Sequence, residues 1–99
     1  MIRSEPHRSF YVLAYDVGDN KRRRKLSKLL ESMGLRVQGS VFEGWLSAHD
    51  LKTLRETAGK ILRAAEDSLR VYCICEECRA KILLIGQSPE TAAPATVIL

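Results

Sequence analysis

The sequence predicts an α+β fold with the element order β-α-β-β-α-β and an extra C-terminal strand. Three observations support this: an apolar, β-rich segment near the start, two segments with helical hydrophobic periodicity, and short β-rich segments between and after them. The 99 residues are enough for one domain and too few for two. With 45% hydrophobic and 28% charged residues, the composition is that of a globular rather than a disordered chain.

Residues 10–15 are apolar at every position, which predicts a central strand buried on both faces. Asp16 ends this strand and a turn follows. A helix is predicted over residues 20–33, because its apolar residues recur at i, i+3, i+4 and i+7. Either Asp19 or Asn20 can cap the start of that helix. The apolar stripe consists of Leu26, Leu29, Leu30 and Met33, and Gly34 is placed to end the helix.

Residues 35–46 predict one or two strands, with Gly39 or Gly44 at a bend, bulge or turn. A second helix begins at a capping box, in which Ser47 is followed three residues later by Asp50.

The second helix is expected to continue to about Ala65, and strands are expected over residues 68–75 and 81–85. We assign residues 1–86 to a single domain. Residues 87–99, rich in Pro, Ala, Thr and Ser, form a C-terminal tail whose last three residues can dock as a short edge strand.

This element order is the split βαβ arrangement of ferredoxin-like folds. Both helices then cover one face of an antiparallel sheet. The other face of the strand at residues 10–15 is also apolar, and the chain has no segment left to cover it. A homodimer through this open face of the sheet is therefore expected.

The positive charge is concentrated in the first half of the chain. The net charge is +4, and residues 1–45 alone hold nine basic and five acidic residues. The basic residues cluster at 21–25, at Lys28 and at Arg36. Several of them lie in the first turns of a helix, where the helix dipole disfavours cations. Either a polyanionic partner or a solvated helix face explains the cluster.

Asp16, at the end of a buried strand beside the basic helix, is the first candidate for chemistry. It is either a turn residue that binds local backbone N–H groups or a ligand for Mg²⁺ or Mn²⁺. A two-fold dimer would bring a second Asp16 to the same site, where a metal could activate water and polarise a scissile phosphate. Asp19, as a helix cap, already has a structural role.

The remaining titratable residues give weaker signals. His7 and His49 lie far from Asp16 in the sequence and receive no catalytic role. Cys73, Cys75 and Cys78 are too few for a disulfide framework, which suits a reducing compartment. They are either reduced core residues or ligands of a structural zinc that lacks a fourth partner.

Three segments closely resemble the CRISPR-associated protein two family, in order and with the family's spacing across residues 9–86. They are Tyr15-Asp16-Val17-Gly18-Asp19-Asn20-Lys21-Arg22-Arg23-Arg24-Lys25-Leu26, Gly34-Leu35-Arg36-Val37-Gln38 and Ser40-Val41-Phe42-Glu43-Gly44. The resemblance implies a ferredoxin-like homodimer with metal-dependent endonuclease activity on RNA or DNA. It also implies a role in capturing new CRISPR spacers, as a bridge between subunits of the CRISPR integrase.

The family's essential metal ligand maps onto Asp16, and Tyr15, Arg23, Arg36, Ser40 and Phe42 match positions that the family links to the site or its integrity. We expect the backbone of the nucleic acid to be held by Arg22, Arg23, Arg24 and Arg36. The longer polar N-terminus, Gly39 and Lys25 depart from the usual family pattern.

Two further functions remain open. One is a non-catalytic dimeric scaffold that binds duplex DNA and the integrase subunits, which needs the arginines but not Asp16. The other, a ferredoxin-like RNA-binding module, is disfavoured because no pair of stacking aromatic residues is present. No apolar run is long enough to span a membrane and no signal peptide is recognisable, so we expect a cytoplasmic protein.

Overall fold

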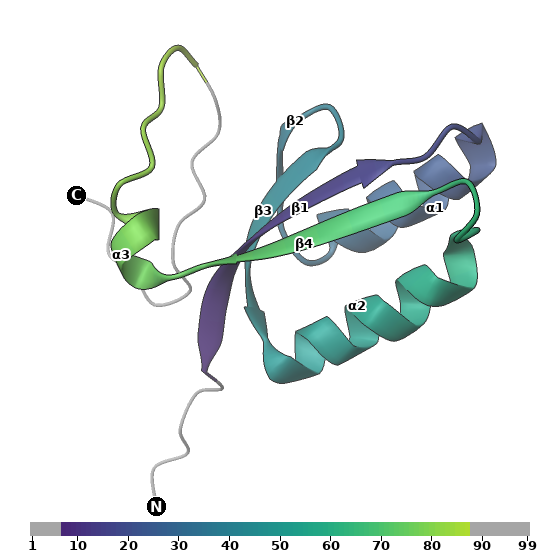
Figure 1. The fold of residues 1–99 in the computed structure, drawn as a ribbon, viewed down its shortest axis with the longest axis horizontal. Helices are drawn as coiled ribbons and strands as arrows, with labels where there is room; N and C mark the ends of the chain where they lie inside the picture. The colour runs from purple at the N-terminus through teal and green to yellow at the C-terminus, as the bar shows by residue number, and fades with distance from the viewer. Residues whose placement is uncertain (1–6, 88–99) are drawn as a thin grey trace, which may run out of the picture.

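The computed structural model describes residues 7–87 (Figure 1). The first six elements follow the order β-α-β-β-α-β that the sequence predicted, and a one-turn helix follows them. In chain order the elements are β1 (Arg8–Asp16), α1 (Asn20–Glu31), β2 (Leu35–Gln38), β3 (Val41–Ser47), α2 (Ala48–Ile61), β4 (Ser68–Ile74) and α3 (Glu76–Arg79).

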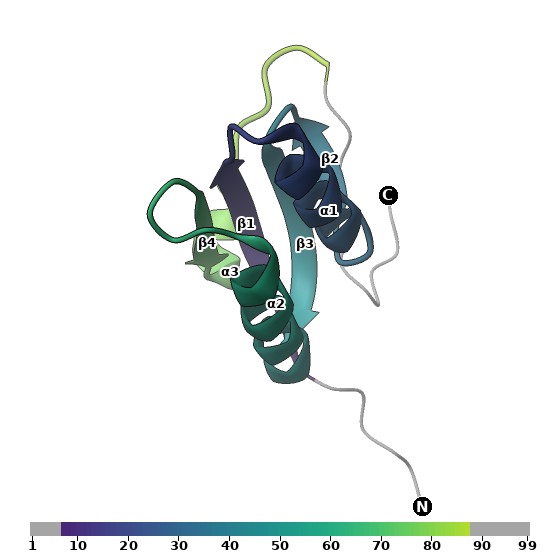
Figure 2. The same ribbon diagram turned by 90° about the vertical axis from the view of Figure 1, so that its right-hand side faces the viewer.

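The four strands form one antiparallel sheet in the order β2-β3-β1-β4. The central strand β1 pairs with both β3 and β4, so that Leu13 lies opposite Phe42 on one side and Val71 on the other. Helices α1 and α2 lie side by side on one face of the sheet (Figure 2). The ferredoxin-like arrangement expected from the sequence is thus confirmed.

The hydrophobic core lies between the sheet and the two long helices. Alternate residues of β1 and β3 point into it and meet the apolar stripes of the helices, as strand and helix periodicity require. Its buried members are Leu13, Tyr15, Val17, Leu26, Leu30, Phe42, Leu46, Leu54 and Ala58. Both long helices are capped as predicted, by the Asp19 side chain on the backbone N–H of Arg22 and by the capping box of Ser47 and Asp50.

Two glycines let the end of α1 approach β3 closely. A Cβ atom on Gly44 would lie 2.6 Å from the carbonyl oxygen of Met33, and one on Gly34 would collide with the carbonyl oxygen of Glu43. Both obstacles are backbone atoms, so neither can yield without moving an element. Gly39 has another role, because its φ of +25° lies in the left-handed region within the turn between β2 and β3.

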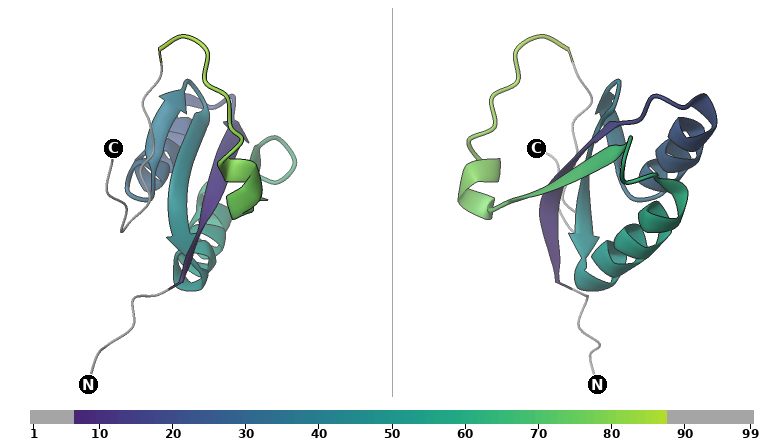
Figure 3. Two further views of the ribbon diagram at one scale, coloured as in Figure 1. Left: turned by 90° about the vertical axis from the view of Figure 1, so that its left-hand side faces the viewer. Right: turned by 45° about the vertical axis from the view of Figure 1, so that its right-hand side comes forward.

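The predicted strand at residues 81–85 is wrong for the single chain. After β4 the chain turns into α3 instead, and the segment that follows pairs with no strand among the described residues (Figures 1 and 3). Its side chains are exposed, Leu83 by 79% and Ile85 by 85%. A β-rich run forms a strand only where it pairs with a sheet edge, and the α3 turn separates this segment from β4. The docking strand expected at residues 97–99, and all of the predicted tail except Gln87, lie outside the described residues.

Two smaller predictions also change. The second helix ends at Ile61 rather than near Ala65. The residues after it form a separate turn, in which the backbone N–H groups of Glu66 and Asp67 donate to the carbonyl oxygen of Arg63. The open face of the sheet is partly covered, because Arg79 of α3 stacks 5.4 Å from the ring of Trp45, which itself packs edge-on against Phe10. Within residues 7–87, no helix is both long and apolar enough to cross a membrane.

The close contact between α1 and β3 predicts opposite outcomes for two Gly→Ala substitutions. Gly44→Ala forces a methyl group against the Met33 carbonyl and is expected to lower the free energy of unfolding by roughly 1–3 kcal/mol. Gly59→Ala, in α2 with open space around it, is the control and is expected to raise it by about 0.5–1 kcal/mol. Urea denaturation of both variants measures the two changes, and equal destabilisation would contradict this account of Gly44.

Candidate catalytic and nucleic-acid-binding site

Asp16 is the last residue of β1, where the central strand leaves the sheet. Its side chain is exposed and makes no hydrogen bond or ion pair with any described residue. In the register of the sheet it lies opposite Ser68 of β4. Because side chains alternate along a strand, Asp16 belongs to the face of β1 opposite the core residue Tyr15.

The other three aspartates of the chain are all occupied by structural contacts. Asp19 caps α1, and this hydrogen bond from the backbone N–H of Arg22 holds the pKa of its carboxyl below the usual value. Asp50 caps α2, where the backbone N–H of Ser47 lowers its pKa in the same way. Asp67 accepts a 2.7 Å hydrogen bond from Arg22. Asp16 therefore remains as the aspartate available to a ligand.

A stack of side chains supports the end of β1 from the core side. Tyr15 packs against Phe42 with ring centroids 6.4 Å apart, and the Arg36 guanidinium lies 4.8 Å from the centroid of the Phe42 ring. The backbone N–H of Tyr15 also donates to the carbonyl oxygen of Ser40, 3.1 Å away. Tyr15, Phe42, Arg36 and Ser40 thus support the end of the strand that carries Asp16.

Arg22 forms the strongest charge cluster in the described chain. Its Nε donates to Oδ2 of Asp67 over 2.7 Å, and its Nη2 to Oε2 of Glu66 over 2.9 Å. The Asp67 side chain is out of contact with solvent, and the Arg22 side chain is only 16% exposed. The hydrogen bond from Arg22 lowers the pKa of Asp67, and the backbone N–H of Arg63 adds to the effect. Arg22 thus ties α1 to the loop before β4.

Arg23 and Arg36 also make contacts within the chain. Arg23 donates to the carbonyl oxygens of Val17 and Gly18 and to the Asn20 side chain, closing the loop between Asp16 and α1. Arg36 donates to Ser27, to the carbonyl oxygen of Gly39 and to Glu31. Both arginines retain exposed surface, but their first role is to hold the elements on either side of Asp16.

The side chains that remain free form what we call the basic face of α1. They follow helical spacing, i, i+3, i+4 and i+7, all are exposed, and none makes a hydrogen bond or ion pair with the described residues. Of the predicted arginines only Arg24 belongs to this face. The spacing was visible in the sequence and would have identified the other members: Lys21, Lys25 and Lys28.

Arg70 was not predicted from the sequence. In β4 it lies opposite Ala14, which places it diagonally next to Asp16 on the same face of the sheet, within reach of a long side chain. It hydrogen bonds to the hydroxyl of Tyr72. Only the strand register brings Arg70 to this place, since 54 positions separate the two residues in the sequence.

The three cysteines are exposed, which contradicts the interpretation of them as core residues. β4 ends at Ile74, so Cys75 and Cys78 belong to the α3 turn. The zinc interpretation receives no support either: within residues 7–87 no group of three or more His, Cys, Asp or Glu side chains could hold a metal ion.

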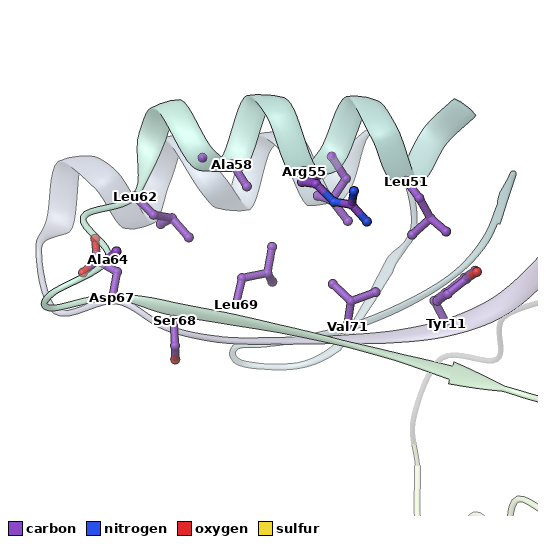
Figure 4. A pocket seen from close by; sticks show the side chains of 12 residues that line it. Tyr11, Leu51, Arg55, Ala58, Leu62, Ala64, Asp67, Ser68, Leu69 and Val71 are labelled. Carbon is purple, nitrogen blue, oxygen red and sulfur yellow. The ribbon is translucent and has the colours of Figure 1, made fainter. Parts of the chain in front are cut away.

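An apolar groove of about 650 Å³ separates α2 from β4 on the helix side of the sheet (Figure 4). Leu51, Leu62, Leu69 and Val71 point into it, with Arg55 at its rim. β4 is an edge strand among the described strands, so this groove borders unpaired backbone.

Comparison with known proteins places the chain in a family. A sequence model described as CRISPR associated protein Cas2 matches residues 9–82. A Synechocystis relative named CRISPR-associated endoribonuclease Cas2 3 is 42% identical over 89 residues, which are 90% of this chain and 97% of the relative. The chain belongs to the Cas2 family.

Two solved structures agree with this Cas2 assignment. The crystal structure of the hypothetical protein TT1823 from Thermus thermophilus has a TM-score of 0.76 and 38% identity, over 86% of this chain and 99% of that one. A chain in a partial Cas6-RT-Cas1–Cas2 complex has a TM-score of 0.69 and 34% identity, over 78% of this chain and 90% of that one.

The ion pair between Arg22 and Asp67 predicts a pH-dependent stability. Because folding lowers the pKa of Asp67, its contribution is present above the unfolded value of about 3.9 and is lost as the pH falls through the lower folded value. Asp67→Asn is therefore expected to lower the Tm at pH 7, with a difference from the wild type that shrinks on acidification below about pH 4. Glu66→Gln, at a partner carboxylate that is 60% exposed, is the control with a smaller effect. A difference in Tm that is independent of pH would contradict this role for Asp67.

Proposed function

We propose that this Cas2-family protein is a metal-dependent endoribonuclease that acts as a homodimer in CRISPR spacer acquisition. One observation carries the proposal: Asp16 is exposed and unpartnered at the end of the central strand, while the three other aspartates hold the fold. A carboxylate that makes no hydrogen bond or ion pair with residues 7–87, on a strand end supported by Tyr15, Phe42 and Ser40, is available as a metal ligand.

The chemistry of Asp16 suits a hard divalent cation. Mg²⁺ takes oxygen ligands and is commonly held by one or two protein carboxylates, together with waters and phosphate oxygens. Such a cation, when bound, makes water more acidic and offsets the charge of the scissile phosphate. Among residues 7–87 no group of three or more His, Cys, Asp or Glu side chains could hold a metal ion, so Asp16 has no such cluster beside it in its own chain. The second carboxylate is then the Asp16 of a partner copy.

Exposed apolar surface supports the homodimer. Ile82 and Leu84 are each about half exposed, and Leu83 and Ile85 more fully, although the run has the composition of a strand. Among residues 7–87, no strand pairs with the outer edge of β4, and the groove lies beside that edge (Figure 4). In a two-fold dimer, the apolar segment of each copy can pair with the outer edge of β4 in its partner.

The basic face of α1 is the surface we assign to the backbone of the nucleic acid. It presents four free cations, and its first member follows Asp16 by only five positions. Phosphate contacts of this kind position a substrate without reading its sequence. Of the four arginines expected to bind the substrate, Arg24 keeps this role unchanged, and Arg22 acts on the substrate only by holding α1 in place.

Replacement of Asp16 tests the nuclease. In Mg²⁺, Asp16→Asn is expected to reduce cleavage of single-stranded RNA by at least about 100-fold, because the cation loses its protein ligand. Dimerisation, followed by sedimentation, and RNA binding are expected to persist. Asp19→Asn is the matched control: it removes a neighbouring carboxylate but keeps a good helix cap, so cleavage is retained. Equal cleavage by the wild type and Asp16→Asn would refute the proposed nuclease activity. Preferential cleavage of a matched DNA duplex would mean that the substrate is DNA rather than RNA.

A scaffold function is the second candidate, and the structural similarity to a chain in a complex that contains Cas1 favours it. We infer that the dimer would bind duplex DNA through the basic faces of its two copies and bridge the Cas1 integrase. This function needs the lysines and Arg24 but tolerates the loss of Asp16. A variant Asp16→Asn that lacks cleavage yet still supports spacer integration with Cas1 would establish the scaffold as the function in acquisition.

The basic face predicts a salt-dependent change in affinity for either candidate. Arg24→Gln is expected to weaken binding at low salt and to reduce the slope of log K against log salt by about 1, because one phosphate contact is lost. Lys52→Gln, an exposed site on α2 with the same change in charge, is the control and leaves the slope nearly unchanged. Binding isotherms at several salt concentrations measure both slopes. Identical slopes for the two variants would mean that only net charge matters.

A further inference from the structure

Arg70 and Asp16 lie on the same face of the sheet, on the neighbouring strands β4 and β1 (Figure 1). Asp16 faces Ser68 and Ala14 faces Arg70, so Arg70 is the diagonal neighbour of Asp16. Diagonal neighbours across an antiparallel pair lie about 7–8 Å apart, which a long side chain can span. Helices α1 and α2 cover the other face of the sheet (Figure 2), so both residues belong to the face that these helices leave open.

The surface between Arg70 and Asp16 is formed by small side chains. On β1 the residue before Asp16 on this face is Ala14, whose side chain is a methyl group. On β4 the residue opposite Asp16 is Ser68, which is also small and is exposed. The one-turn helix α3 follows the opposite end of β4, so it does not separate the two residues. A ligand that lies on Asp16 is therefore accessible to the guanidinium of Arg70.

No carboxylate among residues 7–87 neutralises the charge of Arg70. Its side chain is exposed, and within that part of the chain its hydrogen-bond partner is the hydroxyl of Tyr72, 3.3 Å from Nη1. Arg22 and Arg36, by contrast, form ion pairs with carboxylates. An anionic phosphate accepts stronger hydrogen bonds from a guanidinium than a neutral hydroxyl does, and it can accept two in parallel. Arg70 can therefore exchange the Tyr72 contact for a phosphate that lies beside Asp16.

We propose that Arg70 binds the scissile phosphate of the RNA substrate at the Asp16 site, an inference that rests on the nuclease proposed above. The guanidinium donates hydrogen bonds to the non-bridging oxygens and offsets the negative charge that grows on them in the transition state. In the hydrolysis, the oxygen of water bonds to phosphorus and the bond from phosphorus to the leaving sugar oxygen breaks. One proton of the water finally resides on that sugar oxygen, while Arg70 keeps its own protons throughout.

Binding of a short single-stranded oligoribonucleotide tests the phosphate contact separately from cleavage. The measurement uses the full chain with Asp16→Asn, in EDTA, so that hydrolysis does not interfere. Adding Arg70→Gln to this variant is expected to weaken the affinity by about tenfold, because a charged hydrogen-bonding group is lost. Arg70→Lys, which keeps the charge but not the planar fork, is expected to have a smaller effect. Arg55→Gln, at an exposed arginine of α2, is the control with the same change in charge and little change in affinity.

Cleavage in Mg²⁺ with Asp16 intact tests whether the phosphate bound by Arg70 is the scissile one. Arg70→Gln is expected to lower kcat by about 100-fold, a larger change than that in KM, because the phosphate carries most charge in the transition state. Tyr72→Phe removes the present partner of Arg70 but no phosphate contact, so it is expected to bind and cleave as the wild type does. An equal loss in Tyr72→Phe would mean that Arg70 acts only through its contact with Tyr72, and would overturn the proposal.

The role of Arg70 and the nuclease itself fail in different ways. If Asp16→Asn abolishes cleavage while Arg70→Gln cleaves and binds normally, the nuclease stands and the role of Arg70 is overturned. Equal cleavage by Asp16→Asn and the wild type would refute the nuclease and the scissile role together, and the binding comparison with Arg55→Gln would then decide the phosphate contact alone. Loss of the dimer in Arg70→Gln, measured by sedimentation, would identify Arg70 as an interface residue and would also overturn the proposal.

Discussion

The pairing of β1 with both β3 and β4 is the constraint on which the rest of the structure depends. One face of β1 carries Leu13 and Tyr15 into the core, so that packing against the helices fixes the distance between the strand and the helices. Because neighbouring strands pair with β1 on both edges and the core packs against one of its faces, its last residue, Asp16, has a defined position. The Asp16 side chain itself makes no hydrogen bond or ion pair with residues 7–87. The fold thus positions the proposed metal ligand through its backbone and the neighbouring side chains, which leaves the carboxylate available to a ligand.

Charge in the first half of the chain serves two purposes that its sequence does not separate. Arg22, Arg23 and Arg36 bind carboxylates, carbonyl oxygens or an aromatic ring within the chain and so hold the elements around Asp16. The four cations of the basic face, by contrast, share one exposed side of α1. Lys21 lies near the positive end of the helix dipole, where a cation is disfavoured unless an anion joins it, whereas Lys28 lies in the last turn. The run of five basic residues therefore divides into arginines that make contacts within the chain and exposed cations, which we propose as a binding surface, and helical geometry shows which residue is which.

The sequence predicted those features that depend on local chemistry. Strand and helix periodicity located β1 and both long helices, and the capping residues Asp19, Ser47 and Asp50 were identified from their spacing. It did not predict features that arise from contacts distant in sequence: Asp67 binding Arg22 across 45 positions, or Arg70 beside Asp16 through strand register. Residues 81–85 show the same limit: their composition predicts a strand, but the chain turns into α3 after β4 and this segment pairs with no described strand.

The absence of contacts at Asp16 also bears on how its function can be established. Substitution of a residue such as Asp67 changes the fold and the surface together, because its carboxylate anchors Arg22. Asp16 makes no hydrogen bond or ion pair with the described residues. Replacing its carboxylate with an amide of the same shape therefore removes a charge and a proposed metal ligand without leaving another polar group unpaired. A loss of cleavage on such a replacement is then explained by the chemistry of the site. Retention of DNA binding is explained by the basic face of α1. The feature that makes Asp16 the best candidate for catalysis also allows the nuclease and scaffold functions to be separated in one variant.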